Sequence, residues 1–567
     1  MSEVKENDQL PSIKHEAKVI RPLGYLERFE AAMLSLDLYR SSMLTCRFAV
    51  PATLLPAESH AKLQQTVESA VARILLEHPL LRVGLRGEHN RKPAFVELDA
   101  VDFSRHIEWR HLDIGKDYDT ELEALIKSRL NIKVEQPETA PAWRILMLSI
   151  EGGRFIDVMW EWGHSHTDGI SAKTFHEDML RHLNGHNDNS VPEGFNPETR
   201  ILTIPLARRR DLLPSLHSLC DFPVGLGFTL ATLWNEFKPA VLQAKSEAGL
   251  RATWAPIWPG RYASEYRHFG ISPIALKNII AACRVQGTTL TGLAQALAHT
   301  SLACRLSDEQ ARAFRGSTIV NWRPLMKRAL NEKAKADVRD VMVDDVDLVR
   351  TMGNFMTTVD HVFDEEWVTK IRAASVINDS SQRGLNHSEG KRGETEENFK
   401  DQEVVERRML ALESLIWPVA KTVRVDLVKR LDEGTKNDQM GLMKFIPDFR
   451  ALLKERLEKP RSHSVAVSNI GVINGKAPSS LNGVENPVEG ASDAFTGANA
   501  KWSIDRSIFS ISSEVHGAAF GVCLVAAKDG ELYVSCDWQE SAVSTELGGG
   551  LTADLESWLK FFGRDQA

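Results

Sequence analysis

The segment from Trp160 to Leu183 reads WEWGHSHTDGISAKTFHEDMLRHL and joins three local patterns. It begins at the end of an alternating run that is typical of a β-strand, passes through a turn with two histidines, an aspartate and a glycine, and ends on a helical pattern. The apolar residues of the helical part share one face, and they are Ala172, Phe175, Met179, Leu180 and Leu183. The segment therefore predicts strand, tight turn and amphipathic helix, with its polar groups gathered in the turn.

Strand-like and helical patterns alternate on both sides of this segment. A helical run over 63–77 stops before Pro79, and strand-like runs cover Trp143–Ile150 and Arg154–Trp162. This interleaving predicts an α/β fold. A break in the pattern near 239–259 suggests three parts: a flexible leader over 1–20, an N-terminal lobe over 21–250 and a C-terminal lobe over 251–567. Charged or Gly-rich composition predicts exposed loops at 378–408 and 478–500.

Composition excludes several classes of protein. The chain has 69 Lys and Arg against 77 Asp and Glu, a net charge of −8, so it lacks the overall positive field that favours nucleic acid. Its six cysteines form no CxxC pair, which argues against a structural zinc site.

The N-terminus has no signal-peptide pattern, and we expect a cytoplasmic monomer. The apolar stretch over 221–237 is too short to span a bilayer; we favour a buried or substrate-facing helix there and leave contact with a lipid surface open.

The spacing His-x-x-x-Asp occurs twice, starting at His164 and at His217, but only the first is followed by glycine and lies between a strand and a helix. An imidazole at the end of a buried strand can project into a cleft and act as a general base. We therefore interpret His164 as a candidate base, Asp168 as a residue that orients the turn through a cation and nearby amides, and Gly169 as the residue that permits the turn. The alternative is a buried histidine beside a helix-capping aspartate.

A second interpretation takes His164, His166 and Asp168 as zinc ligands of a metal-dependent hydrolase. Such sites need further ligands. Gly169 stands where that pattern usually has its next histidine, and no downstream His or Cys cluster offers a partner set. We therefore favour a site without metal.

The motif HSHTDG, together with PAWR at 141–144, resembles the HxxxDG core of the chloramphenicol acetyltransferase-like superfamily. Four further blocks, in matching order, resemble the fungal alcohol acetyltransferase family within it: RPLGYLERFE from Arg21, FGISPIALKNIIAACRVQGTTLTGLAQAL from Phe269, VNWRPL at 320–325 and VSNIGV at 467–472. The resemblance covers about 21–562. The DFGWG block of the plant branch is absent, and the second histidine lies inside the motif, at His166, where we expect a solvated or outer position.

The resemblance implies two similar lobes, each a mixed sheet flanked by helices, with a tunnel between them. It implies an acetyl-CoA-dependent O-acetyltransferase that acts on an alcohol, with acetyl-CoA as co-substrate and no metal. His164 would deprotonate the acceptor in a ternary complex without an acyl-enzyme, and Asp168 would pair with Arg323 of the second lobe. The candidates for the oxyanion or substrate side would be Ser468, Asn469 and Asn321. An amine acceptor remains open, and so does a non-catalytic relative that binds a CoA ester or lipid.

Overall fold

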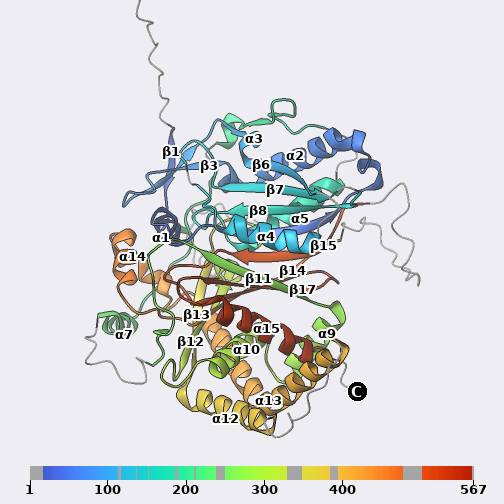
Figure 1. The fold of residues 1–567 in the computed structure, drawn as a ribbon. Coiled ribbons are helices and arrows are strands. Elements are labelled where there is room, and N and C mark those ends of the chain that lie inside the picture. The colour runs from blue at the N-terminus through green and yellow to red at the C-terminus, as the bar shows by residue number, and fades with distance from the viewer. Residues whose placement is uncertain are drawn as a thin grey trace, which may run out of the picture.

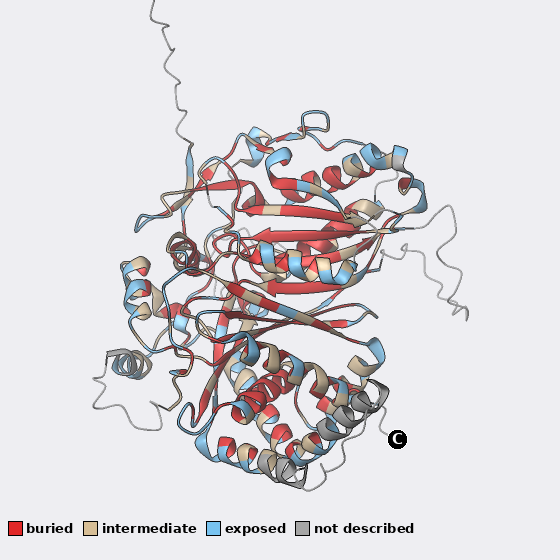
Figure 2. Cartoon of the chain, viewed as in Figure 1, coloured by how far each residue is buried: buried red, intermediate tan, exposed pale blue. Residues whose placement is uncertain are grey.

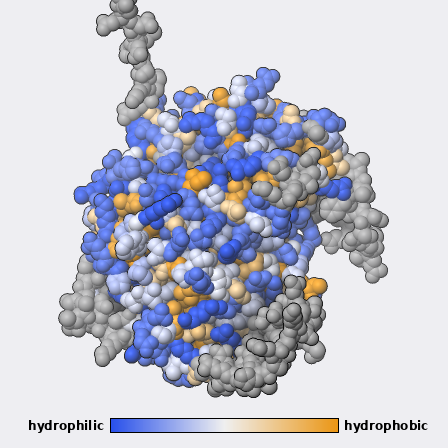
Figure 3. All heavy atoms as spheres, in the orientation of Figure 1, coloured by the Kyte–Doolittle hydropathy of each residue, from blue (hydrophilic) through white to orange (hydrophobic). Residues whose placement is uncertain are grey.

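Two main sheets, each covered by helices, form the structure, which is a computed structural model (Figure 1). It describes residues 17–112, 117–135, 137–150, 152–185, 190–209, 212–237, 249–328, 348–382, 394–476 and 501–564. Buried residues concentrate in the strands and on the inner faces of the helices (Figure 2). The face seen in Figure 3 is mostly hydrophilic, with hydrophobic side chains in small groups. The predicted α/β fold is confirmed.

The first lobe is built on a five-stranded sheet. Its strands, in spatial order, are β15 (Ser503–Ile511), β2 (Ser42–Ala49), β8 (Phe155–Trp162), β7 (Trp143–Ile150) and β6 (Ile107–Leu112). Alternation along β2 sends Leu44 and Phe48 into the core with the helices α2 (His60–Glu77) and α5 (Gly169–Gly185), whereas Met43 packs with α4 (Tyr118–Leu130) on the other face. Both faces of the sheet are therefore covered.

The strand that leads to the histidine turn is anchored by buried charges. Glu161 near the end of β8 is fully buried, and its carboxylate accepts hydrogen bonds of 2.6 Å from both Arg129 of α4 and Arg144 of β7. Arg144 is the arginine of the PAWR block. Because a buried carboxylate is costly unless paired, these two cations fix the end of β8 immediately before the turn.

The second lobe is built on a six-stranded mixed sheet. Its strands, in spatial order, are β11 (Ser264–Ile271), β17 (Leu532–Gln539), β16 (Phe520–Ala527), β14 (Val465–Ile473), β12 (Phe314–Asn321) and β13 (Met356–Phe363). β14 pairs in parallel with both β12 and β16, and the other pairs are antiparallel. The helices of this lobe are α9 (Pro273–Val285), α10 (Leu290–Arg305), α12 (Glu365–Gln382), α13 (Glu394–Asp432) and α15 (Thr545–Phe562). The Ala- and Leu-rich helix α10 is buried over most of its length and forms the centre of the core on that side.

Smaller elements complete the fold. One three-stranded sheet has the spatial order β1 (Val19–Pro22), β4 (Ala94–Glu97) and β3 (Val83–Arg86). A second has the order β5 (Ala100–Asp102), β10 (Ile201–Thr203) and β9 (Phe195–Asn196). The remaining α-helices are α1 (Tyr25–Ser35), α3 (Phe103–His106), α6 (Leu216–Leu219), α7 (Leu226–Phe237) and α14 (Phe449–Leu457).

The two lobes share one strand. β15 comes from the C-terminal part of the chain, yet it pairs antiparallel with β2 at the edge of the first sheet. A division at residue 250 would place β15 in the other lobe, so the predicted domain bounds do not hold for this strand. Of the predicted leader, residues 1–16 lie outside the described residues, whereas Val19 and Ile20 belong to β1, which pairs with β4.

Two expectations about individual segments were wrong. Of the loop predicted over 378–408, residues 378–382 belong to α12 and 394–408 to α13, while 383–393 and the whole of 478–500 lie outside the described residues. Residues 226–237 of the apolar segment form α7, but Leu226, Leu230 and Trp234 on it are 76%, 57% and 57% exposed, so the buried alternative is wrong, whereas a substrate-facing helix stays a prediction. Among the described residues, no helix is long and apolar enough to cross a membrane.

Candidate active site

His164 lies in the turn between β8 and α5 and is 8% exposed. Its Nδ1 is 3.0 Å from the carbonyl oxygen of Thr167, and its Nε2 is 3.0 Å from Oγ of Ser42. A carbonyl oxygen only accepts hydrogen bonds, so Nδ1 must carry the hydrogen, and the lone pair of the neutral ring is on Nε2. Burial lowers the pKa of His164, although the charge of Asp168 and the bond to Thr167 act in the opposite direction. The ring is thus held neutral, in the form that can accept a proton.

Asp168 precedes α5 directly and is 3% exposed. Its two oxygens accept hydrogen bonds of 2.8 and 2.9 Å from Nη1 and Nη2 of Arg323, in a bidentate pair. They also accept from the backbone N–H of Ser171 at 2.9 Å and of Phe355 at 3.0 Å. Burial alone would raise the pKa of Asp168, but Arg323 and these N–H groups lower it below its usual value. Asp168 therefore stays ionised, with both of its oxygens committed to the protein.

Arg323 reaches this site from the end of β12 in the second lobe and is 1% exposed. Asn321 Oδ1 accepts from the backbone N–H of Arg323 at 3.1 Å and from its Nη1 at 3.2 Å. The carbonyl oxygen of Thr351 accepts from Nε at 2.9 Å. The ion pair that the family resemblance implied between Asp168 and Arg323 is present, and Asn321 is directed at the arginine.

The segment before β13 supplies contacts that sequence reasoning missed. Nδ2 of Asn354 donates to the carbonyl oxygen of His164 at 2.7 Å, across 190 positions of the chain. Gly353 donates its N–H to Oγ of Ser171 at 3.0 Å and accepts from the same hydroxyl through its carbonyl at 3.0 Å. The one local signal is the Gly-Asn pair in TMGNF ahead of a strand, and it predicts a turn without showing what the turn contacts.

Gly169 is explained by a close approach of the two lobes. A Cβ at this position would come within 2.8 Å of Cγ2 of Ile470 and 3.2 Å of the ring of Phe509. Ile470 belongs to β14 and Phe509 to β15, so strands from the C-terminal part of the chain press on the start of α5. Glycine is needed here because no space remains for a side chain, which refines the prediction that it merely permits the turn.

The two neighbouring candidates on β14 point in opposite directions. Val467 packs in the core with α10, and Nδ2 of Asn469 donates to Oγ1 of Thr291 on α10 at 3.1 Å. Side chains alternate from Val467 to Asn469, so Ser468 faces the other side of the sheet, as does its register partner Cys523 of β16, whose side chain packs in the core of the first lobe. The structure therefore directs Ser468 toward the first lobe and places Asn469 against the second-lobe helices.

His166 does not join a metal site with His164 and Asp168. It is 3% exposed, Nδ1 lies 2.8 Å from Oγ of Ser165, and the ring packs edge-on against Phe95 with centroids 4.9 Å apart. Burial lowers the pKa of His166 to about 3. The expected solvated position is thus wrong, because the ring is enclosed in the first-lobe interior. With the oxygens of Asp168 taken by Arg323, these residues do not form a zinc ligand set.

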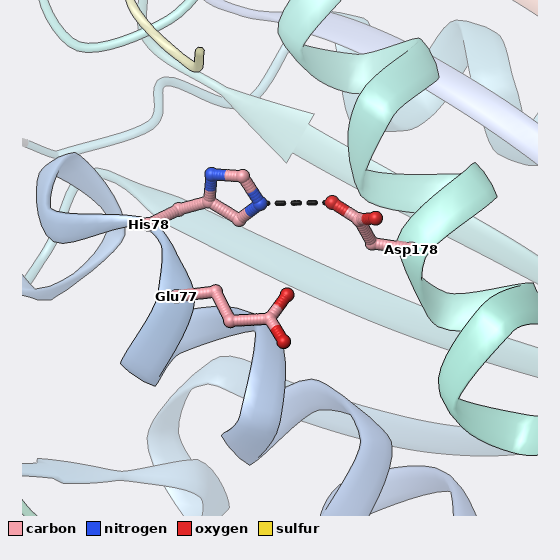
Figure 4. A group of neighbouring side chains, drawn as sticks. All are labelled: Glu77, His78 and Asp178. Atoms are coloured by element: carbon pink, nitrogen blue, oxygen red, sulfur yellow. Dashed lines mark hydrogen bonds and ion pairs between the residues drawn. The ribbon is translucent and has the colours of Figure 1, made fainter. Parts of the chain in front are cut away.

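Among the described residues, one group of His and carboxylate side chains does bring its ligand atoms within 4.8 Å of one another, namely Glu77, His78 and Asp178 (Figure 4). His78 Nε2 is 2.8 Å from Oδ2 of Asp178. Arg181 Nη2 lies 2.5 Å from Glu77 and 3.0 Å from Asp178, and Arg350 also pairs with Asp178. Protein cations thus already neutralise both carboxylates, and the group ties α2 and α5 to the segment before β13.

Comparisons with known proteins agree with this architecture. A family model described as alcohol acetyltransferase matches residues 98–315. A probable alcohol acetyltransferase of Fusarium pseudograminearum is 23% identical over 558 residues, covering 96% of each chain.

Two solved structures share the fold. One is the TRI3 trichothecene 15-O-acetyltransferase of Fusarium sporotrichioides, with a TM-score of 0.60 and 12% identity, covering 96% of this chain and 94% of that one. The other is the first condensation domain of the CDA synthetase, with a TM-score of 0.51 and 14% identity, covering 97% of this chain and 98% of that one. At family level, these findings support acetyl transfer to alcohols. They support an acyltransferase that is similar to the alcohol acetyltransferase family over residues 98–315, and the two solved structures show the same fold.

Proposed function

We propose that the protein transfers an acetyl group from acetyl-CoA to the hydroxyl group of an alcohol, with His164 as the general base. The observation that carries this proposal is the neutral imidazole of His164, whose Nδ1–H is fixed on Thr167 so that the lone pair is on Nε2. A hydroxyl proton moves to Nε2 as the acceptor oxygen attacks the thioester carbonyl. The same proton then passes to the sulfur of the departing CoA, so no covalent acyl-enzyme is required.

Asp168 and Arg323 position the base and do not touch substrate. Their ion pair, together with the bond from Asn354 to the backbone of His164, fixes the turn from the second lobe. A hydroxyl acceptor is supported by the trichothecene 15-O-acetyltransferase that shares the fold. We expect acetyl-CoA and the acceptor to meet at Nε2 through the tunnel between the lobes that the family resemblance implies.

The test is incubation with acetyl-CoA and a panel of alcohols and amines, following the release of free thiol. We expect turnover with at least one alcohol, loss of turnover in His164→Ala, and unchanged turnover in His89→Ala, which alters an exposed histidine. Chelators should leave the rate unchanged. Turnover with amines alone would replace the O-acetyltransferase assignment by N-acetylation, and chelator-sensitive activity with stoichiometric zinc would favour the hydrolase. Ligand binding by the wild type without any turnover would favour a non-catalytic relative.

We further propose that Ser468 donates to the oxyanion that forms on the thioester carbonyl. Ser468 is 8% exposed and faces the first lobe, whereas its neighbour Asn469 bonds Thr291. Removing one such donor typically costs about 100-fold in kcat. We expect Ser468→Ala to show a loss of that order at unchanged stability, and Asn469→Ala to lower the melting temperature instead. Equal kcat in wild type and Ser468→Ala would exclude Ser468 from this role.

A further inference from the structure

Two hydroxyl groups continue from Nε2 of His164 into the protein interior. Ser42 Oγ is 3.0 Å from Nε2, and the hydroxyl of Tyr39 is 2.7 Å from Ser42 Oγ. Ser42 is fully buried and Tyr39 is 1% exposed. The imidazole, Ser42 and Tyr39 therefore form one continuous hydrogen-bonded chain, which we call the hydroxyl chain.

The pairing of strands explains why this chain exists. Ser42 is the first residue of β2 and pairs with Trp162, the last residue of β8, so its side chain lies next to the turn that begins two residues later. The backbone around it is tied to the second half of the molecule. Oγ of Ser512 accepts from the N–H groups of Arg40 and Ser41 at 3.1 and 3.0 Å. The hydroxyl chain is thus held by segments that lie far apart in the sequence.

The direction of each bond follows from the state of the imidazole. In the neutral ring Nε2 only accepts, so Ser42 donates to Nε2 and Tyr39 donates to Ser42. When the ring gains a proton, Nε2 becomes a donor. A hydroxyl can both donate and accept, so both bonds can then reverse, with Nε2 donating to Ser42 and Ser42 to Tyr39. The chain therefore offers a partner to either state of the base in a place where water does not surround it.

We infer that Ser42 and Tyr39 are positioning residues for the transfer reaction, and that their hydroxyl chain orients His164 and stabilises the imidazolium while it carries the acceptor's proton. This inference rests on the proposed function. Nε2 has a single lone pair, so the acceptor hydroxyl replaces the Ser42 hydroxyl on it when substrate binds. The acceptor's proton then moves to Nε2, and the resulting Nε2–H donates to Ser42 Oγ until the proton passes to the CoA sulfur. Ser42 and Tyr39 keep their own protons after each turnover and form no bond to the acetyl group.

The experiment compares kcat and KM of Ser42→Ala, Ser42→Thr, Tyr39→Phe and the double variant Ser42→Ala/Tyr39→Phe. Loss of one hydrogen bond to the base predicts a fall of about ten-fold in kcat for Ser42→Ala, with KM for the acceptor within about two-fold of wild type. Ser42→Thr should recover most of the rate because it restores a hydroxyl. Tyr39→Phe should cost about three-fold in the wild type and nothing further in the Ser42→Ala background, because Tyr39 acts through Ser42.

A matched control and a spectroscopic readout separate positioning from general destabilisation. Ser41 is as buried as Ser42, and its hydroxyl has no hydrogen-bond partner within the part of the chain that the structure describes, so Ser41→Ala should keep the wild-type kcat. The ¹⁵N resonance of Nε2 in labelled His164 should shift in Ser42→Ala at constant pH, because its hydrogen bond is lost. The shift should be absent in Ser41→Ala.

The outcomes distinguish the hydroxyl chain from the proposed function. If Ser42→Ala has the kcat of the wild type while His164→Ala is inactive, the assignment of His164 as the base is retained and the hydroxyl chain is wrong. If His164→Ala retains turnover, the base itself is wrong. If Tyr39→Phe lowers kcat by the same factor in the wild type and in the Ser42→Ala background, the hydroxyl chain is also wrong. If Ser42→Ala does not fold, the kcat values of Ser42→Thr and Tyr39→Phe decide. A rate near that of the wild type in Ser42→Thr, together with a fall in kcat at unchanged KM in Tyr39→Phe, supports the hydroxyl chain. Any other combination of results for these two variants contradicts it.

Discussion

At the scale of single residues, one backbone contact defines which nitrogen of His164 can take a proton. The bond from Nδ1–H to the carbonyl of Thr167 leaves Nε2 as the acceptor, and burial keeps the ring neutral near physiological pH. The same burial makes the imidazolium costly, so the surroundings of Nε2 matter as much as the ring itself. In the proposed mechanism, proton transfer at His164 therefore depends on a few fixed hydrogen bonds.

The lowered pKa of His164 predicts the pH dependence of the reaction. A base works only when unprotonated, so kcat/KM should rise with pH through the pKa of His164 and level off above it. Because that pKa lies below its ordinary value of 6.5, the midpoint of the rise should also lie below 6.5. Rates measured from about pH 5 to 8 provide the check. A midpoint above 6.5 would contradict a buried ring whose charged form is disfavoured.

Asp168→Asn tests whether this carboxylate is structural. The change removes one charge of a buried ion pair and leaves Arg323 without a counter-ion, which typically costs about 3–5 kcal/mol. We expect a clearly lower free energy of unfolding together with lost activity. In the control, Asp37→Asn affects an exposed pair with Arg40, and its cost should lie below about 1 kcal/mol. Lost turnover at unchanged stability would instead indicate that Asp168 takes part directly in chemistry.

At the scale of elements, the start of α5 is the point where both lobes meet the histidine turn. Ile470 of β14 and Phe509 of β15 press on Gly169, and the segment before β13 bonds Asp168 and the backbone of His164. The turn therefore takes its shape from elements of the second half of the chain as well as from its own residues.

Gly169→Ala should disturb this contact. Its Cβ would meet Ile470 at 2.8 Å, and overpacking of this kind typically costs about 1–3 kcal/mol. We expect a lower melting temperature and a lower kcat, because the added methyl group pushes the helix start away from β14. Gly185→Ala, at the other end of the same helix, meets nothing within 4 Å and should leave both unchanged. Equal behaviour of the two variants would argue against the close approach.

At the scale of the whole molecule, the exchange of β15 makes the two lobes interdependent. Ile504 and Phe509 of β15 and Ile470 of β14 are buried in the core of the first lobe, together with Trp160 and Phe175. A first lobe without β15 would expose this apolar surface and leave β2 as an open sheet edge.

A fragment spanning 21–250 should therefore fail to fold by itself. We expect it to be insoluble or to lack the near-ultraviolet circular dichroism of packed aromatic residues, and we expect co-expression with 251–567 to restore a soluble complex. The intact chain should unfold in a single urea transition when followed by both fluorescence and circular dichroism. Cooperative unfolding of the isolated fragment would show that β15 is dispensable.

Local patterns predicted much of this molecule. The alternation of β8, the apolar face of α5 and the glycine after Asp168 located the turn and its candidate base, because those signals depend on neighbours within a few positions. The family resemblance, rather than any spacing, pointed to Arg323 as the partner of Asp168. The exposed side chains of α7 and the helical residues 394–408 were missed, because composition reports polarity without showing what a segment packs against.

By itself, the sequence determined the α/β class and the strand, turn and helix that carry His164, Asp168 and Gly169, since periods of two and 3.6 residues are written locally. Tertiary structure alone decided three contacts. β15 crosses to the first sheet, Asn354 donates a hydrogen bond to the backbone carbonyl of His164, and the Ser42 hydroxyl is hydrogen-bonded to Nε2 of His164. These contacts join residues more than 100 positions apart. Their partners are set by how the sheets register and pack, which no local pattern encodes.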